Sequence, residues 1–131
     1  MGASAAFHLA ERGCSDVVLL ERKTVASGFT GSSSALLRQH YSIELYAKMA
    51  HESFRFYREF TDRVGGDCGL VPCGLAVAIP PDDVPAARRA VTMQQNVGIK
   101  TDLVPPEQLR ELFGEINLDN IGVGVYEPDT G

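Results

Sequence analysis

The chain has 131 residues, of which 44% are apolar, 22% charged and 8% aromatic, a mixture typical of globular proteins rather than disordered or fibrous ones. Twelve basic residues against seventeen acidic ones give a net charge of −5, which disfavours nucleic acid and anionic membrane surfaces as main partners. No apolar run approaches the roughly 18 residues that span a bilayer, and the first residues lack the apolar stretch of a signal peptide. We therefore expect a soluble, cytoplasmic protein.

The cysteine pattern supports neither a disulfide framework nor a zinc site. The three cysteines, Cys14, Cys68 and Cys73, form no CxxC pair. Their number is odd, and no second cluster of metal-ligating residues accompanies them. We expect three reduced thiols and no bound metal.

The chain opens with the pattern of a helix followed by a buried strand. Apolar residues recur at helical spacing over 3–12, and Gly13 offers a left-handed stop just beyond. The continuous apolar run 17–20 is typical of a strand covered on both faces of a parallel sheet. Together the two segments indicate part of a βαβ unit, whose first strand would precede the helix.

A small-residue loop and a long helix come next. Residues 23–34 are rich in Ser, Thr and Gly, which predicts a loop. The segment 42–64 has apolar residues on one side and Ser42 at its start, and this predicts a single amphipathic helix with Ser42 as its N-cap.

The second half of the chain predicts short strands and helices. Strands are indicated by short apolar runs interrupted by proline or glycine, and helices by acidic or proline starts with a glycine stop. The predicted elements are two short strands within 69–79, a helix over 82–97, a strand over 101–104, a short helix that opens at 105–106 and ends before Gly114, and a strand over 121–126.

Gly2 and Glu21 stand in the relation that a dinucleotide-binding fold requires. In such a fold the last glycine of the phosphate-binding turn starts the first helix, and an acidic residue about 20 positions further on accepts hydrogen bonds from ribose hydroxyls. The helix N-terminus offers free N–H groups to the pyrophosphate. A solvated carboxylate at a strand end is the alternative for Glu21, and this pair alone leaves both interpretations open.

The order of segments resembles FAD-dependent oxidoreductases of the D-amino acid oxidase type, which include sarcosine oxidases and dimethylglycine dehydrogenases. The run M-G-A-S-A-A-F-H-L-A-E-R-G followed by V-V-L-L-E-R is similar to the interior of the family's nucleotide-binding turn. The resemblance implies that Gly2 ends a Gly-x-Gly-x-x-Gly motif whose first strand and first two glycines are missing here. It also implies that Glu21 binds ribose. For Arg22 it leaves two interpretations open, a place on the adenosine side and a solvent-exposed arginine.

The segment A-S-G-F-T-G-S-S-S-A-L-L-R-Q-H-Y-S resembles the family's loop that runs past the pyrophosphate toward the flavin ring. The resemblance implies that Gly28, Thr30, Ser33 and Ser34 contact the cofactor. Small residues let backbone approach a cofactor, and hydroxyls hydrogen-bond phosphate or ribityl groups; a flexible Ser/Gly linker is the alternative. Several relatives attach flavin to a histidine in this loop, and the matching residue here is Ser32, so we expect non-covalent FAD.

Arg38 matches a position where related amine oxidases hold an arginine near the substrate carboxylate. A guanidinium suits that task through two parallel hydrogen bonds and a fixed charge. A surface or salt-bridged arginine is the alternative. Further along, G-L-V-P-C-G-L-A-V-A-I is similar to the first segment of the family's substrate domain, and the closing G-V-Y-E-P-D-T-G also fits.

The resemblance implies an oxidoreductase that oxidises a C–N bond of an amino acid or N-methyl amino acid by hydride transfer to FAD. The implied fold class is α/β: a partial FAD-binding Rossmann-like fold over 1–66, then the beginning of a mixed α+β substrate domain over 67–131. We assign no catalytic residue within the chain, and we expect the isolated fragment to be inactive. The alternatives are a noncatalytic nucleotide-binding or interaction module and a fragment of an NAD-type Rossmann enzyme.

Overall fold

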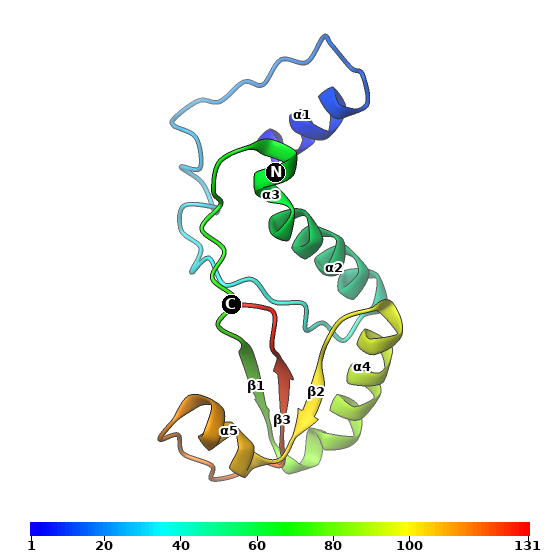
Figure 1. Ribbon diagram of the computed structural model, residues 1–131, viewed down its shortest axis with the longest axis vertical. Helices are drawn as coiled ribbons and strands as arrows, with labels where there is room; N and C mark the ends of the chain where they lie inside the picture. Colours follow the sequence, from blue (N-terminus) through cyan, green and yellow to red (C-terminus); the bar gives the residue numbers. More distant parts are fainter. The chain divides into compact units, whose positions relative to one another are not determined.

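The computed structural model describes residues 1–131. Its contacts divide the chain into two compact units, Met1–Ala35 and Leu36–Gly131, whereas the domain boundary expected at residues 66–67 stays a prediction. In chain order the elements are α1 (Gly2–Glu11), α2 (Glu44–Arg58), α3 (Phe60–Val64), β1 (Leu75–Ile79), the 3₁₀ turn η1 (Pro81–Asp83), α4 (Val84–Val97), β2 (Asp102–Val104), α5 (Pro106–Phe113) and β3 (Val123–Glu127) (Figure 1).

The first unit consists of α1 and an irregular segment that follows it. The predicted helix and its stop are confirmed. The chain leaves the helix through Gly13 at φ +84°, a conformation that glycine adopts without steric cost. The N–H of Gly13 donates to the carbonyl of Ala10 at 2.9 Å and that of Cys14 to the carbonyl of Leu9 at 3.0 Å, so two of the last carbonyls of the helix are satisfied.

The buried strand predicted over 17–20 is wrong. These residues form no β-ladder, and the side chains of Val18 and Leu20 are 81% and 88% exposed. A strand exists only where a neighbouring strand accepts and donates its backbone hydrogen bonds. No such neighbour lies within Met1–Ala35, so the apolar run stays without a sheet.

The second unit is built on a three-stranded antiparallel sheet in the order β1-β3-β2. The last strand of the chain is therefore the central one. Its register pairs Ile79 with Val123 and Leu75 with Glu127 on one side, and Val104 with Gly124 on the other. Only the second of the two strands predicted within 69–79 forms, because the residues before Leu75 have no partner in the sheet.

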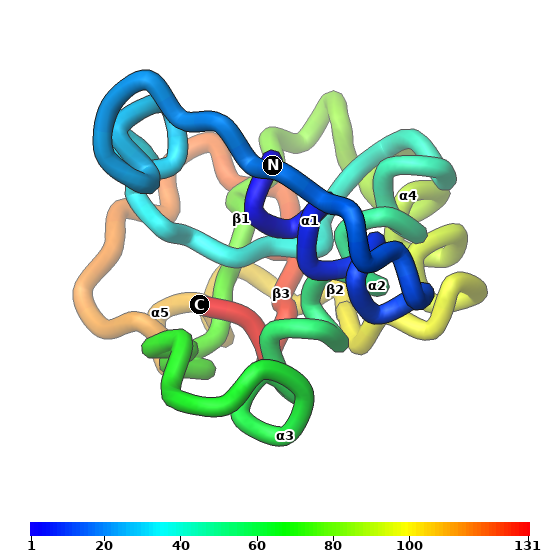
Figure 2. The backbone as a smooth tube through the Cα atoms, turned by 90° about the horizontal axis from the view of Figure 1, so that it is seen from above, coloured from blue at the N-terminus to red at the C-terminus, as the bar shows by residue number.

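Helices α4 and α5 supply the core against this sheet. Helix α4 contacts β2 and β3, and α5 contacts β3 (Figures 1 and 2). Leu109 of α5 is only 1% exposed and lies against Gly124, where a side chain would have no room. The buried core cluster consists of Ala87, Val91 and Val125, with Val77, Ile79 and Leu103 packed against it.

The helices of the second unit follow the predicted pattern with two differences. The predicted helix 42–64 is interrupted at Glu59, which separates α2 from α3. The N-cap of α2 is Ile43 and carries no side-chain hydrogen bond, so the prediction of Ser42 as the cap is wrong. The glycine stop after α4 is confirmed, since Gly98 has φ +98° and the left-handed conformation.

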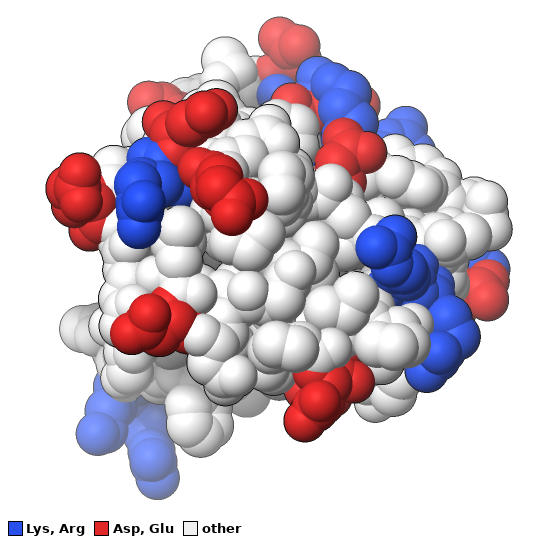
Figure 3. All heavy atoms as spheres, turned by 90° about the horizontal axis from the view of Figure 1, so that it is seen from below, with Lys and Arg blue, Asp and Glu red and all other residues white.

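The surface carries charges of both signs. On the face drawn in Figure 3, acidic and basic side chains are interspersed among uncharged atoms. All three cysteines are exposed and unpaired. None of the helices has the length and apolar character needed to cross a bilayer.

Candidate functional site

The N-terminus of α1 offers unpaired backbone donors. Gly2 is the first helical residue, and Met1 before it makes no side-chain cap. The N–H of Ala5 donates to the carbonyl of Met1 at 2.9 Å, whereas the three N–H groups before it have no carbonyl four residues back. A Cβ on Gly2 would lie 3.0 Å from Cδ1 of Leu19. The start of α1 therefore contacts the side chain of Leu19, two residues before Glu21.

Glu21 and Arg22 are exposed and lie beyond that contact. The Oε1 atom of Glu21 accepts a hydrogen bond from the N–H of Lys23 at 2.8 Å. The second carboxylate oxygen makes no hydrogen bond, so it can accept from a ligand hydroxyl. No hydrogen bond joins Glu21 to Gly2.

The loop of small residues folds back on itself and is exposed throughout. The N–H of Gly31 donates to the carbonyl of Ala26 at 2.8 Å, and a Cβ on Gly31 would collide with that same oxygen. Ser33 Oγ accepts from the N–H of Ala35 at 3.1 Å. The remaining predicted contacts, Gly28, Thr30 and Ser34, lie on the same exposed loop, as does Ser32.

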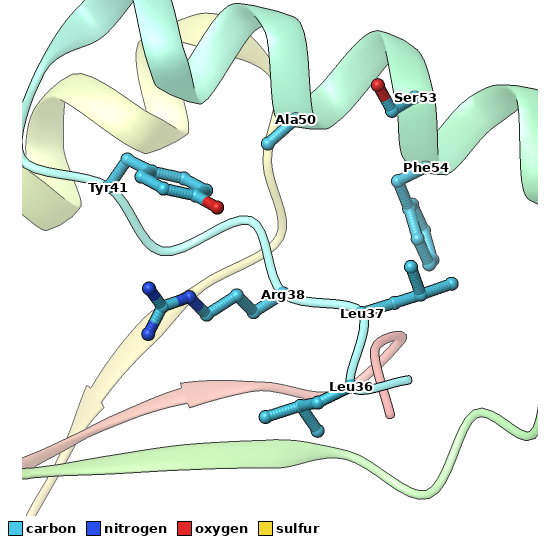
Figure 4. Close-up of a pocket in the computed structure, with 7 residues that line it drawn as sticks. All are labelled: Leu36, Leu37, Arg38, Tyr41, Ala50, Ser53 and Phe54. Atoms are coloured by element: carbon cyan, nitrogen blue, oxygen red, sulfur yellow. The ribbon is translucent and has the colours of Figure 1, made fainter. Parts of the chain in front are cut away.

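Arg38 belongs to the second unit and lines a cavity of about 250 Å³. Its guanidinium carbon lies 5.3 Å from the centre of the Tyr41 ring, within the range of a cation–π contact. Figure 4 shows Arg38 and Tyr41 on one loop segment, and Ala50, Ser53 and Phe54 on helix α2, which faces that segment. The cavity is lined by Leu36, Leu37, Arg38, Tyr41, Ala50, Ser53 and Phe54.

A buried polar network lies behind Arg38, and sequence reasoning missed it. Glu127 is 1% exposed and Gln39 is 3% exposed. Oε2 of Glu127 accepts the N–H of Gln39 at 2.9 Å. A signal was present in the sequence: strand residues alternate between faces, so Glu127 shares a face with Val123 and Val125, which are buried.

Burial raises the pKa of the Glu127 carboxyl above its ordinary value, and the hydrogen bond from Gln39 opposes the rise. The nearby Thr130 side chain and the positive fields of His40 and Arg38 also favour the ionised form. The Oε1 atom of the same carboxyl is buried without a hydrogen-bond partner. A buried acceptor without a partner costs about 1–3 kcal/mol, a cost that packing alone does not explain.

The donor set of the first unit fits a dinucleotide. Free N–H groups at a helix start suit a pyrophosphate, a carboxylate with an unpaired oxygen suits a vicinal diol, and exposed hydroxyls suit further polar contacts. No group of three or more His, Cys, Asp or Glu side chains could hold a metal ion.

Comparison with known proteins decides the family. Residues 1–131, the whole chain, match the family of FAD dependent oxidoreductases named DAO. The chain belongs to this family. The predicted kinship with the D-amino acid oxidase type is thereby confirmed, and with it FAD as the cofactor of the family.

The curated relatives of this DAO-family chain are much longer than the chain itself. It is 31% identical to mitochondrial dimethylglycine dehydrogenase of Rattus norvegicus over 133 residues, which is 100% of this chain and 15% of the relative. It is 30% identical to the mitochondrial pyruvate dehydrogenase phosphatase regulatory subunit of Mus musculus, over 98% of this chain and 15% of the relative. The chain thus spans about 15% of these relatives.

A solved structure confirms the fold. The crystal structure of L-proline dehydrogenase from P. horikoshii superposes with a TM-score of 0.84 at 21% identity, covering 96% of this chain and 33% of that one. The predicted mixture of helices and sheet is confirmed by this match. The cofactor and substrate contacts assigned to single residues stay predictions.

Proposed function

We propose that this chain is part of an FAD-dependent oxidoreductase that oxidises the C–N bond of an amino acid or N-methyl amino acid. The observation that carries the proposal is the match of all 131 residues to the FAD dependent oxidoreductase family. The relative that bears the name dimethylglycine dehydrogenase supports the substrate class. FAD, when bound, supplies the acceptor for the hydride.

The residues of the first unit would hold the cofactor without covalent attachment. The N–H groups at the start of α1 donate to the pyrophosphate, and Gly2 leaves room for the close approach. Glu21 accepts hydrogen bonds from ribose hydroxyls through its unpaired oxygen, with Arg22 on the adenosine side. The loop contributes Gly28 as a site of close backbone approach and the hydroxyls of Thr30, Ser33 and Ser34 as hydrogen-bonding groups.

Arg38 would bind the carboxylate of the substrate. Its guanidinium is exposed and has no hydrogen-bond or ion-pair partner within Leu36–Gly131, so its donors are available. The fixed charge and forked geometry match a carboxylate. Fixing one end of the substrate restricts where its C–N bond can lie, which is how positioning residues lower a barrier.

A noncatalytic module is the second candidate, and one observation favours it. A relative at 30% identity is named as a regulatory subunit of a phosphatase rather than as an oxidoreductase.

Location in the cytoplasm stays a prediction. The names of the two relatives described above both include the word mitochondrial.

Substitution of Glu21 tests the cofactor site. In the full-length protein, E21A should weaken FAD binding by about 1.5–3 kcal/mol, the scale of a hydrogen bond to a charged group. E115A, which removes an exposed carboxylate far along the chain, is the matched control and should leave the FAD dissociation constant unchanged. Equal affinity in E21A and the unchanged protein removes Glu21 from the site.

A redox experiment separates the two candidate functions. Under anaerobic conditions, dimethylglycine or another N-methyl amino acid should bleach the FAD absorbance of the oxidoreductase. A protein that binds FAD and keeps its absorbance with a panel of amino acids and N-methyl amino acids would be the noncatalytic module.

A further inference from the structure

The segment that carries Arg38 is held to the last residues of the chain on both sides of the arginine. The N–H of Leu37 donates to the carbonyl of Gly131 at 2.8 Å, and the N–H of Gly131 donates back to Leu37 at 3.2 Å. The N–H of Gln39 donates to Oε2 of Glu127 at 2.9 Å. Figures 1 and 2 show this segment (cyan) passing beside the C-terminal end (red). Both neighbours of Arg38 therefore have a fixed backbone.

Side-chain hydrogen bonds from α2 and α4 hold the same segment from other directions. The side-chain oxygen of Gln39 pairs with Nδ1 of His51 on α2 at 2.8 Å. On α4, the amide nitrogen of Gln94 donates to the carbonyl of Tyr41 at 2.8 Å, and the oxygen of that amide lies 3.3 Å from Nδ1 of His40. These bonds leave the backbone of the segment little freedom to move.

Arg38 is the exception in this network. Its side chain is exposed, and its guanidinium lies over the Tyr41 ring. The direction of the guanidinium is therefore set by the backbone on either side and by that ring. Of the side chains that hold the backbone, Glu127 is the only carboxylate, and a hydrogen bond to an ionised acceptor is roughly twice as strong as one between neutral groups.

We propose that Glu127 is a positioning residue that fixes the Arg38 guanidinium for a substrate carboxylate by holding the backbone N–H of Gln39. The inference rests on the proposed function, in which Arg38 binds that carboxylate. The Glu127 carboxylate is 1% exposed and one of its oxygens has no hydrogen-bond partner, so its burial costs free energy that a neutral side chain holding the same segment would not cost. Its presence is explained if the strength of the Gln39 bond governs how precisely Arg38 is placed.

Substitution of Glu127 in the full-length, FAD-loaded protein tests the proposal with acetate as the ligand. Acetate carries the carboxylate without a reactive C–N bond, so its dissociation constant, measured by titration calorimetry, reports carboxylate binding without turnover. E127A should raise that constant about tenfold, which corresponds to about 1.4 kcal/mol. E127Q keeps the side-chain shape and a neutral acceptor, so it should restore most of the affinity. E111Q, an exposed glutamate of α5, is the control.

A double-mutant cycle that combines E127A with R38M distinguishes a positioning role of Glu127 from a structural one. In an R38M background, E127A should raise the acetate dissociation constant no further, since the group that it positions is gone. FAD content should remain that of the unchanged protein. If E127A does not fold, the comparison of E127Q with E111Q replaces it. E127Q should then bind acetate about twofold more weakly than E111Q.

The outcomes separate the two proposals. If R38M binds acetate as tightly as the unchanged protein, Arg38 is not the carboxylate ligand and the proposed substrate contact fails. If R38M loses acetate while E127A and E127Q bind it normally, Arg38 keeps its role and the inference about Glu127 is overturned. Equal losses from E127A in the presence and absence of Arg38 also overturn it.

Discussion

Gly124 is the position where the packing of the second unit can be tested most directly. A Cβ at this residue would lie 2.5 Å from Cδ2 of Leu109 and 2.8 Å from Cγ2 of Val104. Carbon atoms in contact normally lie about 3.5–4.0 Å apart, so G124A requires a displacement of roughly 1 Å. Neither side can move freely, because β3 is paired on both edges and Leu109 is 1% exposed.

The expected cost follows from two opposing effects. Overpacking of a core by one methyl group costs about 1–3 kcal/mol, and the reduced freedom of the unfolded chain returns about 0.4–1 kcal/mol. G124A should therefore lower the free energy of unfolding by about 1–2 kcal/mol. Equilibrium urea unfolding measures this change. G28A is the control, since a Cβ at Gly28 meets no atom within 4 Å, and it should stay within about 0.5 kcal/mol.

A double-mutant cycle decides whether Leu109 is the cause. L109A alone should cost about 2–5 kcal/mol through the cavity that it leaves. In the double variant the new methyl group of residue 124 partly fills that cavity, so the loss should be smaller than the sum of the two single losses. Strictly additive losses, or a G124A variant as stable as the unchanged protein, would refute the assigned contact.

Three further predictions concern charge and the serine loop. The pKa of the Glu127 carboxyl is near its ordinary value of 4.5 in the unfolded chain and higher in the folded protein. At pH values between these two pKa values the unfolded state holds fewer protons, so the free energy of unfolding falls as pH rises. Urea unfolding at a series of pH values should show this fall for the unchanged protein and not for E127Q. G31A should weaken FAD binding with little change in melting temperature, because its methyl group collides with the Ala26 carbonyl in an exposed loop. K100A breaks an exposed ion pair with Asp129 of 2.8 Å and should cost less than about 1 kcal/mol, and still less in 1 M salt.

Local signals in the sequence predicted most helices and strands of the second unit. Helix α4 has the expected glycine stop, α5 opens at the expected prolines, and β3 lies within one or two residues of its expected place. These elements were predictable because caps, stops and periodicity are properties of neighbouring residues. Their prediction did not depend on contacts with distant parts of the chain.

The failures concern contacts between distant residues. The apolar run 17–20 has the composition of a buried strand, but a strand depends on a partner that its own residues do not specify. The link from Gln39 to Glu127 spans 88 positions, so no local pattern reveals it. Arg38 was found through the family resemblance, whereas the network that holds its backbone became visible only in the structure.

The sheet order has a consequence for how the protein is made on the ribosome. Because β3 is the central strand and comes last, β1 and β2 emerge during translation with no strand to pair with. Residues 123–131 must leave the exit tunnel before the sheet can form and before Gly131 can bond to Leu37. A nascent chain that stalls earlier would expose unpaired strand edges, which are prone to aggregation.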